Sequence, residues 1–93
     1  MKKSIYTSEY AALCAELRAA RLRAGLSQRA LAAHLDVAPS WVAKVEIGER
    51  RIDLIEFVRF IHACGTDASA AYDRLARRVG GAVMRHARKG GGQ

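Results

Sequence analysis

The amino-acid sequence predicts an all-α domain of five short helices packed around one core. Apolar residues recur every three or four positions in five separate segments, which is the spacing of amphipathic helices. No segment shows the apolar and polar alternation of a β-strand, and no internal repeat is present. The 93 residues, of which 51% are hydrophobic, suffice for one small domain with a thin margin of stability.

The first helix is expected to begin at Tyr6 or Thr7 and to end at Ala24. Gly25 follows it, and a glycine there can take the left-handed conformation that closes a helix without a Cβ clash. The chain should therefore turn sharply after Ala24.

Ser27 occupies the N-cap position of the second helix, which is expected over residues 28–35. Its hydroxyl can accept a hydrogen bond from the free amides of the first turn. Ala32 is small enough to let another helix cross closely. Asp36 stands where a left-handed residue is needed, and Asp tolerates that conformation better than most residues with a side chain.

The third helix is expected over residues 39–47 and begins with Pro39, which loses no hydrogen bond at the first helical position. Val42 and Val45 are its inward residues, and Gly48 ends it. So short a helix is unstable alone in water. Contacts outside the segment must therefore keep it ordered.

Asp53 and Glu56 are spaced as a capping box that starts the fourth helix, and Gly65 stops that helix. The fifth helix is expected over residues 67–79. The glycine pair at 80–81 should interrupt it, with at most one further turn beyond.

The predicted organisation is an N-terminal arm at residues 1–7, one domain at 8–79 and a basic, Gly-rich tail at 80–93. The formal charge is +7, from 16 Lys and Arg against 9 Asp and Glu. Six basic residues and no acid lie between Arg74 and Gln93. This imbalance favours a polyanionic partner, although a solvated basic face without a partner explains it equally well.

Cys14 and Cys64 fall on apolar helix faces and form no CxxC pair, so two buried, reduced thiols are expected. The histidines His34, His62 and His86 lack a neighbouring carboxylate or thiol at metal spacing. No nucleophile constellation or phosphate-binding glycine loop is present either. We therefore expect no metal, no cofactor and no enzyme activity.

The N-terminal segment lacks the apolar core of a secretory signal, and no apolar run is long enough to span a bilayer. A cytoplasmic protein is expected. The high Arg and Ala content hints at a bacterial, GC-rich genome.

A known family is matched by three stretches between residues 18 and 76: RAARLRAGLSQRALAAHLDV, SWVAKVEIGERRIDL and IEFVRFIHACG. They resemble the Cro and repressor type of helix-turn-helix protein, called the XRE family in bacterial regulators. The anchors that match in register are Arg21, Gly25, Leu26, Ser27, Gln28, Leu31, Ala32, Glu46 and Gly48. The resemblance implies a lambda-repressor-like DNA-binding domain whose third helix reads the major groove.

The resemblance also implies roles for individual positions. The residues that face base edges would be Pro39, Ser40 and Lys44. The phosphate-binding residues would be Ser27, Gln28, Arg29, Arg50 and Arg51. Arg21 and Glu46 match an ion pair that braces the first helix to the third.

Three positions depart from the usual pattern. Pro39 stands where many members carry a Gln that reads adenine, and proline cannot donate a hydrogen bond. Ala38 replaces a Ser or Thr cap, and Ile47 replaces a phosphate-contacting Asn. Readout should therefore shift toward Ser40, Lys44 and Trp41, which we expect to face the DNA. The alternative is that Trp41 shields the rim of the core.

One recognition helix reads few base pairs, so a homodimer on a palindromic double-stranded operator is expected. The sequence thus predicts a transcriptional regulator, with repression as the expected mode, associated with the nucleoid. The competing hypothesis is an antitoxin or adaptor whose main role is to bind a protein partner, with DNA binding for autoregulation.

Overall fold

The computed structural model describes the backbone of residues 7–91 and the side chains of residues 7–80. Lys2 and Lys3 of the predicted arm, and the side chains of Arg85–Lys89 in the predicted tail, lie outside this description. Between residues 7 and 91 the chain forms five helices and no strand, which confirms the predicted fold class. The helices are α1 (Ser8–Arg23), α2 (Gln28–Leu35), α3 (Pro39–Glu46), α4 (Leu54–Ala63) and α5 (Ala68–Gly91).

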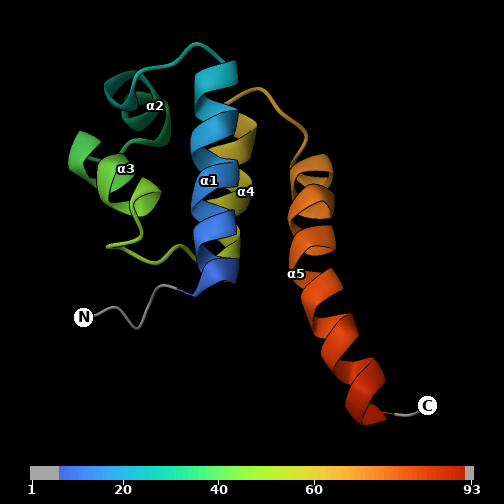
Figure 1. Cartoon of the computed structure of the whole chain (residues 1–93). Coiled ribbons are helices and arrows are strands. Elements are labelled where there is room, and N and C mark those ends of the chain that lie inside the picture. Colours follow the sequence, from blue (N-terminus) through green and yellow to red (C-terminus); the bar gives the residue numbers. More distant parts are fainter. Residues whose placement is uncertain (1–6, 92–93) are drawn as a thin grey trace.

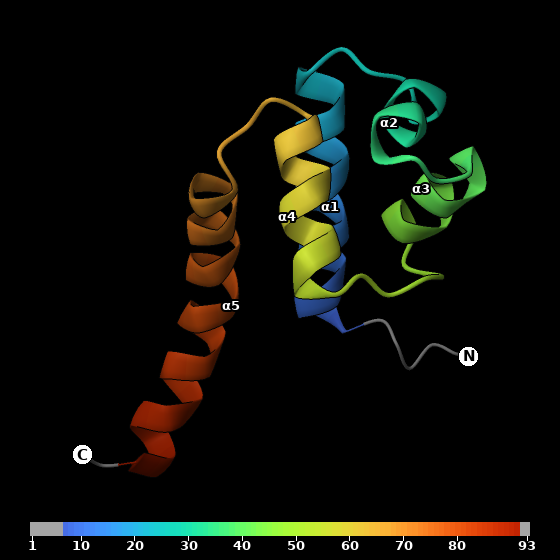
Figure 2. The same ribbon diagram turned by 180° about the vertical axis from the view of Figure 1, so that it is seen from behind.

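Helices α1 and α4 lie side by side in the middle of the molecule (Figure 1). The short pair α2 and α3 packs on one side of them and α5 on the other, as the view from behind also shows (Figure 2). Each of α1 to α4 contributes to a common core, whose fully buried large side chains are Leu17, Leu31, Val42, Val45, Phe60 and Ile61. The predicted inward positions of α3 are therefore confirmed.

The helix ends follow the predicted capping chemistry. Ser27 Oγ accepts from the amide of Ala30 over 3.0 Å. The capping box of α4 is complete, with 2.7 Å from the Glu56 amide to Asp53 Oδ1 and 2.9 Å from the Asp53 amide to Glu56 Oε1. Asp36 takes the predicted left-handed conformation, with φ of 59°. These caps fix where α2 and α4 begin.

The predicted interruption at residues 80–81 is wrong, because α5 continues without a break to Gly91. Glycine weakens a helix by about 0.5–1 kcal/mol relative to alanine but can still adopt helical angles. The residues that follow include Ala, Met, Arg and Lys, which favour helix. At 1.5 Å per residue the 24-residue helix is about 36 Å long.

Cys14 and Cys64 are buried and unpaired, as predicted. Burial raises the pKa of both thiols, since the thiolate loses its hydration. Among the residues described, no helix has both the length and the apolar character needed to cross a membrane.

Arg21 of α1 and Glu46 of α3 form the predicted ion pair, which lies inside the fold. Arg21 Nε donates to Glu46 Oε2 over 2.6 Å, and Arg21 Nη2 donates to Oε1 over 2.9 Å. Their side chains are 8% and 1% exposed. Arg21 Nη1 also donates to the Leu26 carbonyl, and Gln28 Nε2 donates to Glu46 Oε1 over 3.1 Å. We call Arg21, Glu46 and Gln28 the buried brace, because they join α1, α2 and α3.

Replacing Glu46 with Ala should lower the free energy of unfolding by about 3–5 kcal/mol, because the Arg21 guanidinium would stay buried without its counter-ion. Urea titration followed by circular dichroism measures this loss. The control is Glu49→Ala, which removes an exposed carboxylate three residues later and should change stability little. Equal stability of the two variants would contradict the brace.

Replacing Gly80 with Ala should raise the helical circular-dichroism signal, because a Cβ there meets no atom within 4 Å and the glycine is helical. The matched substitution Gly25→Ala also meets open space, but φ is +72°. It should destabilise the domain by about 1–2 kcal/mol, the cost of a left-handed L-residue. A fall in helicity on Gly80→Ala would show that α5 does not continue through this point in solution.

Candidate nucleic-acid interface

The outer face of α3 carries the residues predicted to face base edges. Pro39, Ser40 and Lys44 are exposed, whereas Val42 and Val45 on the inner face are completely buried. Ser40 and Lys44 are four residues apart, so they lie one above the other on the same side of the helix. This face offers a hydroxyl and an ammonium group to a partner.

Ile47 extends this face, although the sequence pattern did not single it out as a candidate contact residue. It lies three residues after Lys44, just beyond the end of α3, and its side chain is 53% exposed. The spacing Ser40, Lys44 and Ile47 follows the helical repeat, which was the available signal. An exposed isoleucine here can make apolar contact with a thymine methyl.

Trp41 is half-buried at the edge of α3. Its ring packs against the core and lines a hollow of about 90 Å³ with Leu35, Val37, Glu56 and Arg59. The Arg50 guanidinium carbon lies 5.4 Å from the ring centroid, within the range of a cation–π contact. The Trp41 side chain therefore packs at the rim of the core. Its contact with DNA stays a prediction.

The N-terminus of α2 presents a second group of predicted contact residues. Ser27 and Arg29 are exposed and Gln28 is half-buried. The backbone amides of the first helical turn have no intrahelical acceptor. The backbone N–H groups of Gln28 and Arg29 can therefore donate to an anion, which the positive end of the helix dipole also attracts. Gln28 Nε2 donates one of its two hydrogens to Glu46. The second hydrogen can be donated to another acceptor.

The loop between α3 and α4 holds Arg50 and Arg51, and both have partners inside the molecule. Arg50 donates to both Glu56 oxygens, over 3.2 and 3.1 Å, and to the Arg51 carbonyl. Arg51 stacks on the Tyr10 ring, with its guanidinium carbon 4.2 Å from the centroid. The Tyr10 hydroxyl also accepts from the Ile52 amide. These contacts join the loop to α1 and α4.

The internal partners of these arginines could not be predicted from the sequence. Arg50 lies in the loop and Glu56 lies in α4. Tyr10 and Arg51 are 41 positions apart. Helical periodicity therefore links neither pair. The only available signal was that Glu56 belongs to the capping box, which places its carboxylate at the start of α4.

The predicted contact residues come from three neighbouring segments. Helices α2 and α3 and the loop after α3 all lie on the side of the molecule away from α5 (Figure 1). Helices α2 and α3 pack against each other, and the small Ala32 of α2 is 1% exposed in the common core. No group of three or more potential metal ligands exists among the described residues.

Two comparisons with known proteins identify this architecture. Residues 12–75 match the family described as "Helix-turn-helix domain". The solved structure of an XRE-family like protein from Pseudomonas syringae pv. tomato str. DC3000 is 42% identical, covers 76% of this chain and 87% of its own, and superposes with a TM-score of 0.73. A search of curated proteins found no match. The chain is a helix-turn-helix protein of the XRE family, and it is therefore a DNA-binding regulator.

Proposed function

We propose that the protein is a sequence-specific transcriptional repressor that inserts α3 into the major groove of double-stranded DNA as a homodimer. The observation that carries this proposal is the two-sided character of α3. Val42 and Val45 anchor it in the core, while Ser40 and Lys44 lie exposed one turn apart. A helix ordered in this way can present the same donors to every duplex.

Within this proposal the contact residues divide into two groups. Ser40, Lys44 and Ile47 contact base edges, with Lys44 donating to guanine O6 or N7. The residues that hold the phosphate backbone are Ser27, Gln28, Arg29, Arg50 and Arg51. The buried brace positions Gln28 at this backbone, because Glu46 holds its amide group. Binding at a promoter in the nucleoid suffices for repression, since the occupied site is closed to other proteins.

Replacing Lys44 with Ala should lower affinity for a selected operator and relax base preference at one position by about 1–3 kcal/mol, without changing the melting temperature. Arg29→Ala is the matched comparison, because it removes one exposed cation from α2. It should weaken all sequences alike and reduce the salt slope by about one. Fluorescence anisotropy against operator and single-base variants, at several salt concentrations, separates the two results. The assignment fails if Lys44→Ala weakens every sequence equally.

The homodimer is proposed on an apolar trough between α5 and the lower ends of α1 and α4. One hollow of about 230 Å³ is lined by Leu13, Ile52, Asp53, Leu54, Phe57, Tyr72 and Leu75. A second, of about 330 Å³, shares Tyr72 and Leu75 and continues along α5 to Gly80. Leu54 is 67% exposed and Tyr72 is 58% exposed, so apolar surface remains uncovered here.

A second copy of the chain is the proposed occupant of this trough. Helix α5 extends beyond the body formed by α1 and α4 (Figure 2). Each copy therefore carries both a trough and a protruding helix, which is the self-complementarity that a twofold dimer requires. Two recognition helices related in this way would read the two halves of a palindrome.

Replacing Leu54 with Glu should make the protein monomeric at micromolar concentration, because a carboxylate would be buried in the dimer. Leu22→Glu is the matched control: Leu22 is 52% exposed on α1 and lies outside the trough residues. Sedimentation velocity distinguishes the variants. A wild-type chain that stays monomeric both free and on DNA would refute the dimer, and co-purification of a different protein in its place would favour an adaptor role.

A further inference from the structure

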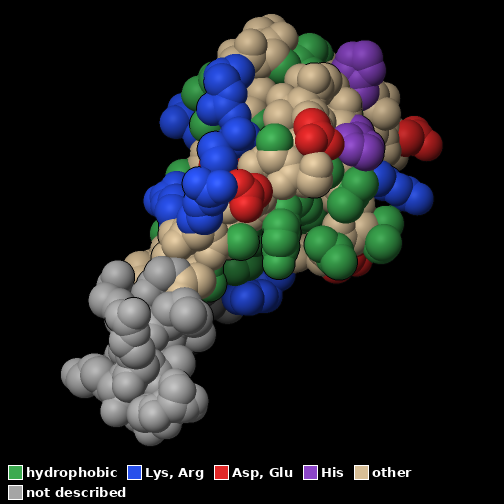
Figure 3. Space-filling model, turned by 90° about the vertical axis from the view of Figure 1, so that its right-hand side faces the viewer, with side chains coloured by type: hydrophobic (Ala, Val, Ile, Leu, Met, Phe, Trp, Pro, Cys, Tyr) green, Lys and Arg blue, Asp and Glu red, His purple; other side chains and the backbone are tan. Residues whose placement is uncertain are grey.

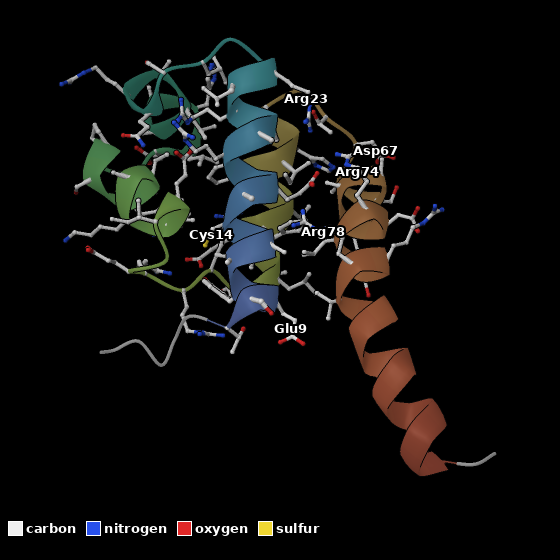
Figure 4. All side chains as sticks on the ribbon, viewed as in Figure 1. Glu9, Cys14, Arg23, Asp67, Arg74 and Arg78 are labelled. Atoms are coloured by element: carbon white, nitrogen blue, oxygen red, sulfur yellow. The ribbon has the colours of Figure 1, made fainter. Side chains whose placement is uncertain are left out.

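A group of arginines lies on the opposite side of the molecule from α3. Arg23 at the end of α1 joins Arg74, Arg77 and Arg78 of α5, and all four are exposed. We call these four residues the arginine stripe. Figure 3 shows Lys and Arg side chains gathered along this side of the molecule as far as the grey atoms. The carboxylates paired with the stripe are Glu16 and Asp73. Asp67, just before α5, stands two turns from Arg74 on the same flank (Figure 4). Four cations against these three carboxylates leave one positive charge in excess.

Glu16 holds part of the stripe in place. Its side chain is only 8% exposed, and its Oε2 accepts from Arg74 Nε over 2.9 Å and from Arg74 Nη2 over 2.7 Å. Arg23 Nη2 lies 3.9 Å from the same oxygen. Arg74 stays 46% exposed, so its remaining N–H groups can donate outward. Figure 4 shows Arg23 and Arg74 together at the upper end of the α1–α5 contact. Because Glu16 holds it, the Arg74 guanidinium is ordered before any partner binds. This order lowers the entropic cost of binding.

The stripe and the apolar trough occupy different flanks of α5. At 100° per residue, Arg74 and Arg78 lie on one flank, and Tyr72 and Val79 lie on the other. Ala71, which is fully buried, faces the body between them. A second copy in the trough therefore leaves the arginine stripe accessible.

We propose that the arginine stripe binds the phosphate backbone of a second DNA duplex, so that the protein bridges two segments of DNA. This inference rests on the proposed function, because the first duplex is bound through α2 and α3. Those helices and α5 lie on opposite sides of α1 and α4 (Figure 1). One duplex lying against α3 is therefore not in position to reach the stripe of the same copy.

The composition of the stripe favours DNA over an acidic protein. All four cations are arginines, whose planar fork matches phosphate oxygens. The large exposed apolar side chains of α4 and α5 (Leu54, Ile55 and Tyr72) are outside the stripe, and Tyr72 lies on the other flank of α5. Protein interfaces depend on such apolar anchors, whereas backbone contacts to DNA do not. The sequence after Asp73 contains no acid that would repel phosphate, and it adds Arg85, Arg88 and Lys89 to α5.

The test is a two-duplex capture experiment with the full chain. A biotinylated duplex carrying a selected operator is immobilised and saturated with protein, and a fluorescent duplex of unrelated sequence is then added. The wild-type protein should capture the second duplex. Arg78→Gln should reduce its apparent affinity about eightfold at 0.1 M salt, which follows from a slope of about 0.9 for one lost phosphate contact. Affinity for the immobilised operator should stay unchanged.

Arg59→Gln is the matched control, because Arg59 is also exposed and helical but lies on α4, beside α2. It removes the same charge and should leave capture of the second duplex, normalised to bound protein, unchanged. The proposal is overturned if the wild-type protein binds its operator yet captures no second duplex, or if both variants lose capture equally. Competition by polyglutamate as strong as by DNA would also overturn it. Failure to bind the operator at all would instead refute the proposed function.

Discussion

The buried ion pair between Arg21 and Glu46 is the interaction on which the reading surface depends. Helix α3 has eight residues, too few to be stable in isolation, and its N-cap Ala38 makes no side-chain hydrogen bond. Its order comes from Val42 and Val45 in the core and from Glu46, which joins it to α1. Because Glu46 also accepts from Gln28, the same carboxylate joins the first residue of α2 to α3. One buried charge thus aligns both halves of the helix-turn-helix.

Much of the fold could be predicted from local chemistry. Ser27, Asp53 and the left-handed Asp36 act within one turn of their own backbone, so their positions alone indicate the helix ends. The break expected at residues 80–81 was wrong, because it was inferred from the two glycines alone. A glycine pair weakens a helix by an amount that favourable neighbours can offset, and no sequence pattern shows the balance.

The candidate site was predictable in part. Ser40 and Lys44 follow from helical spacing and from the resemblance, and the structure places both on the exposed face of α3. The Arg50–Glu56 and Arg51–Tyr10 contacts join residues from different elements, so only the folded chain brings them together. Trp41 shows the limit of periodicity most clearly. Its angle on the helix places it at a boundary, and the neighbours at that boundary are supplied by α2 and α4.

The continuity of α5 has a consequence for how the molecule tolerates change in length. In an unbroken helix, one inserted or deleted residue rotates everything beyond it by about 100° and shifts it by about 1.5 Å. Side chains beyond the change would then no longer line up with the flank that carries Arg74 or with the flank that carries Tyr72. Insertions of seven residues, close to two full turns, keep that orientation. Length variation in this helix should therefore be accommodated in steps of whole turns.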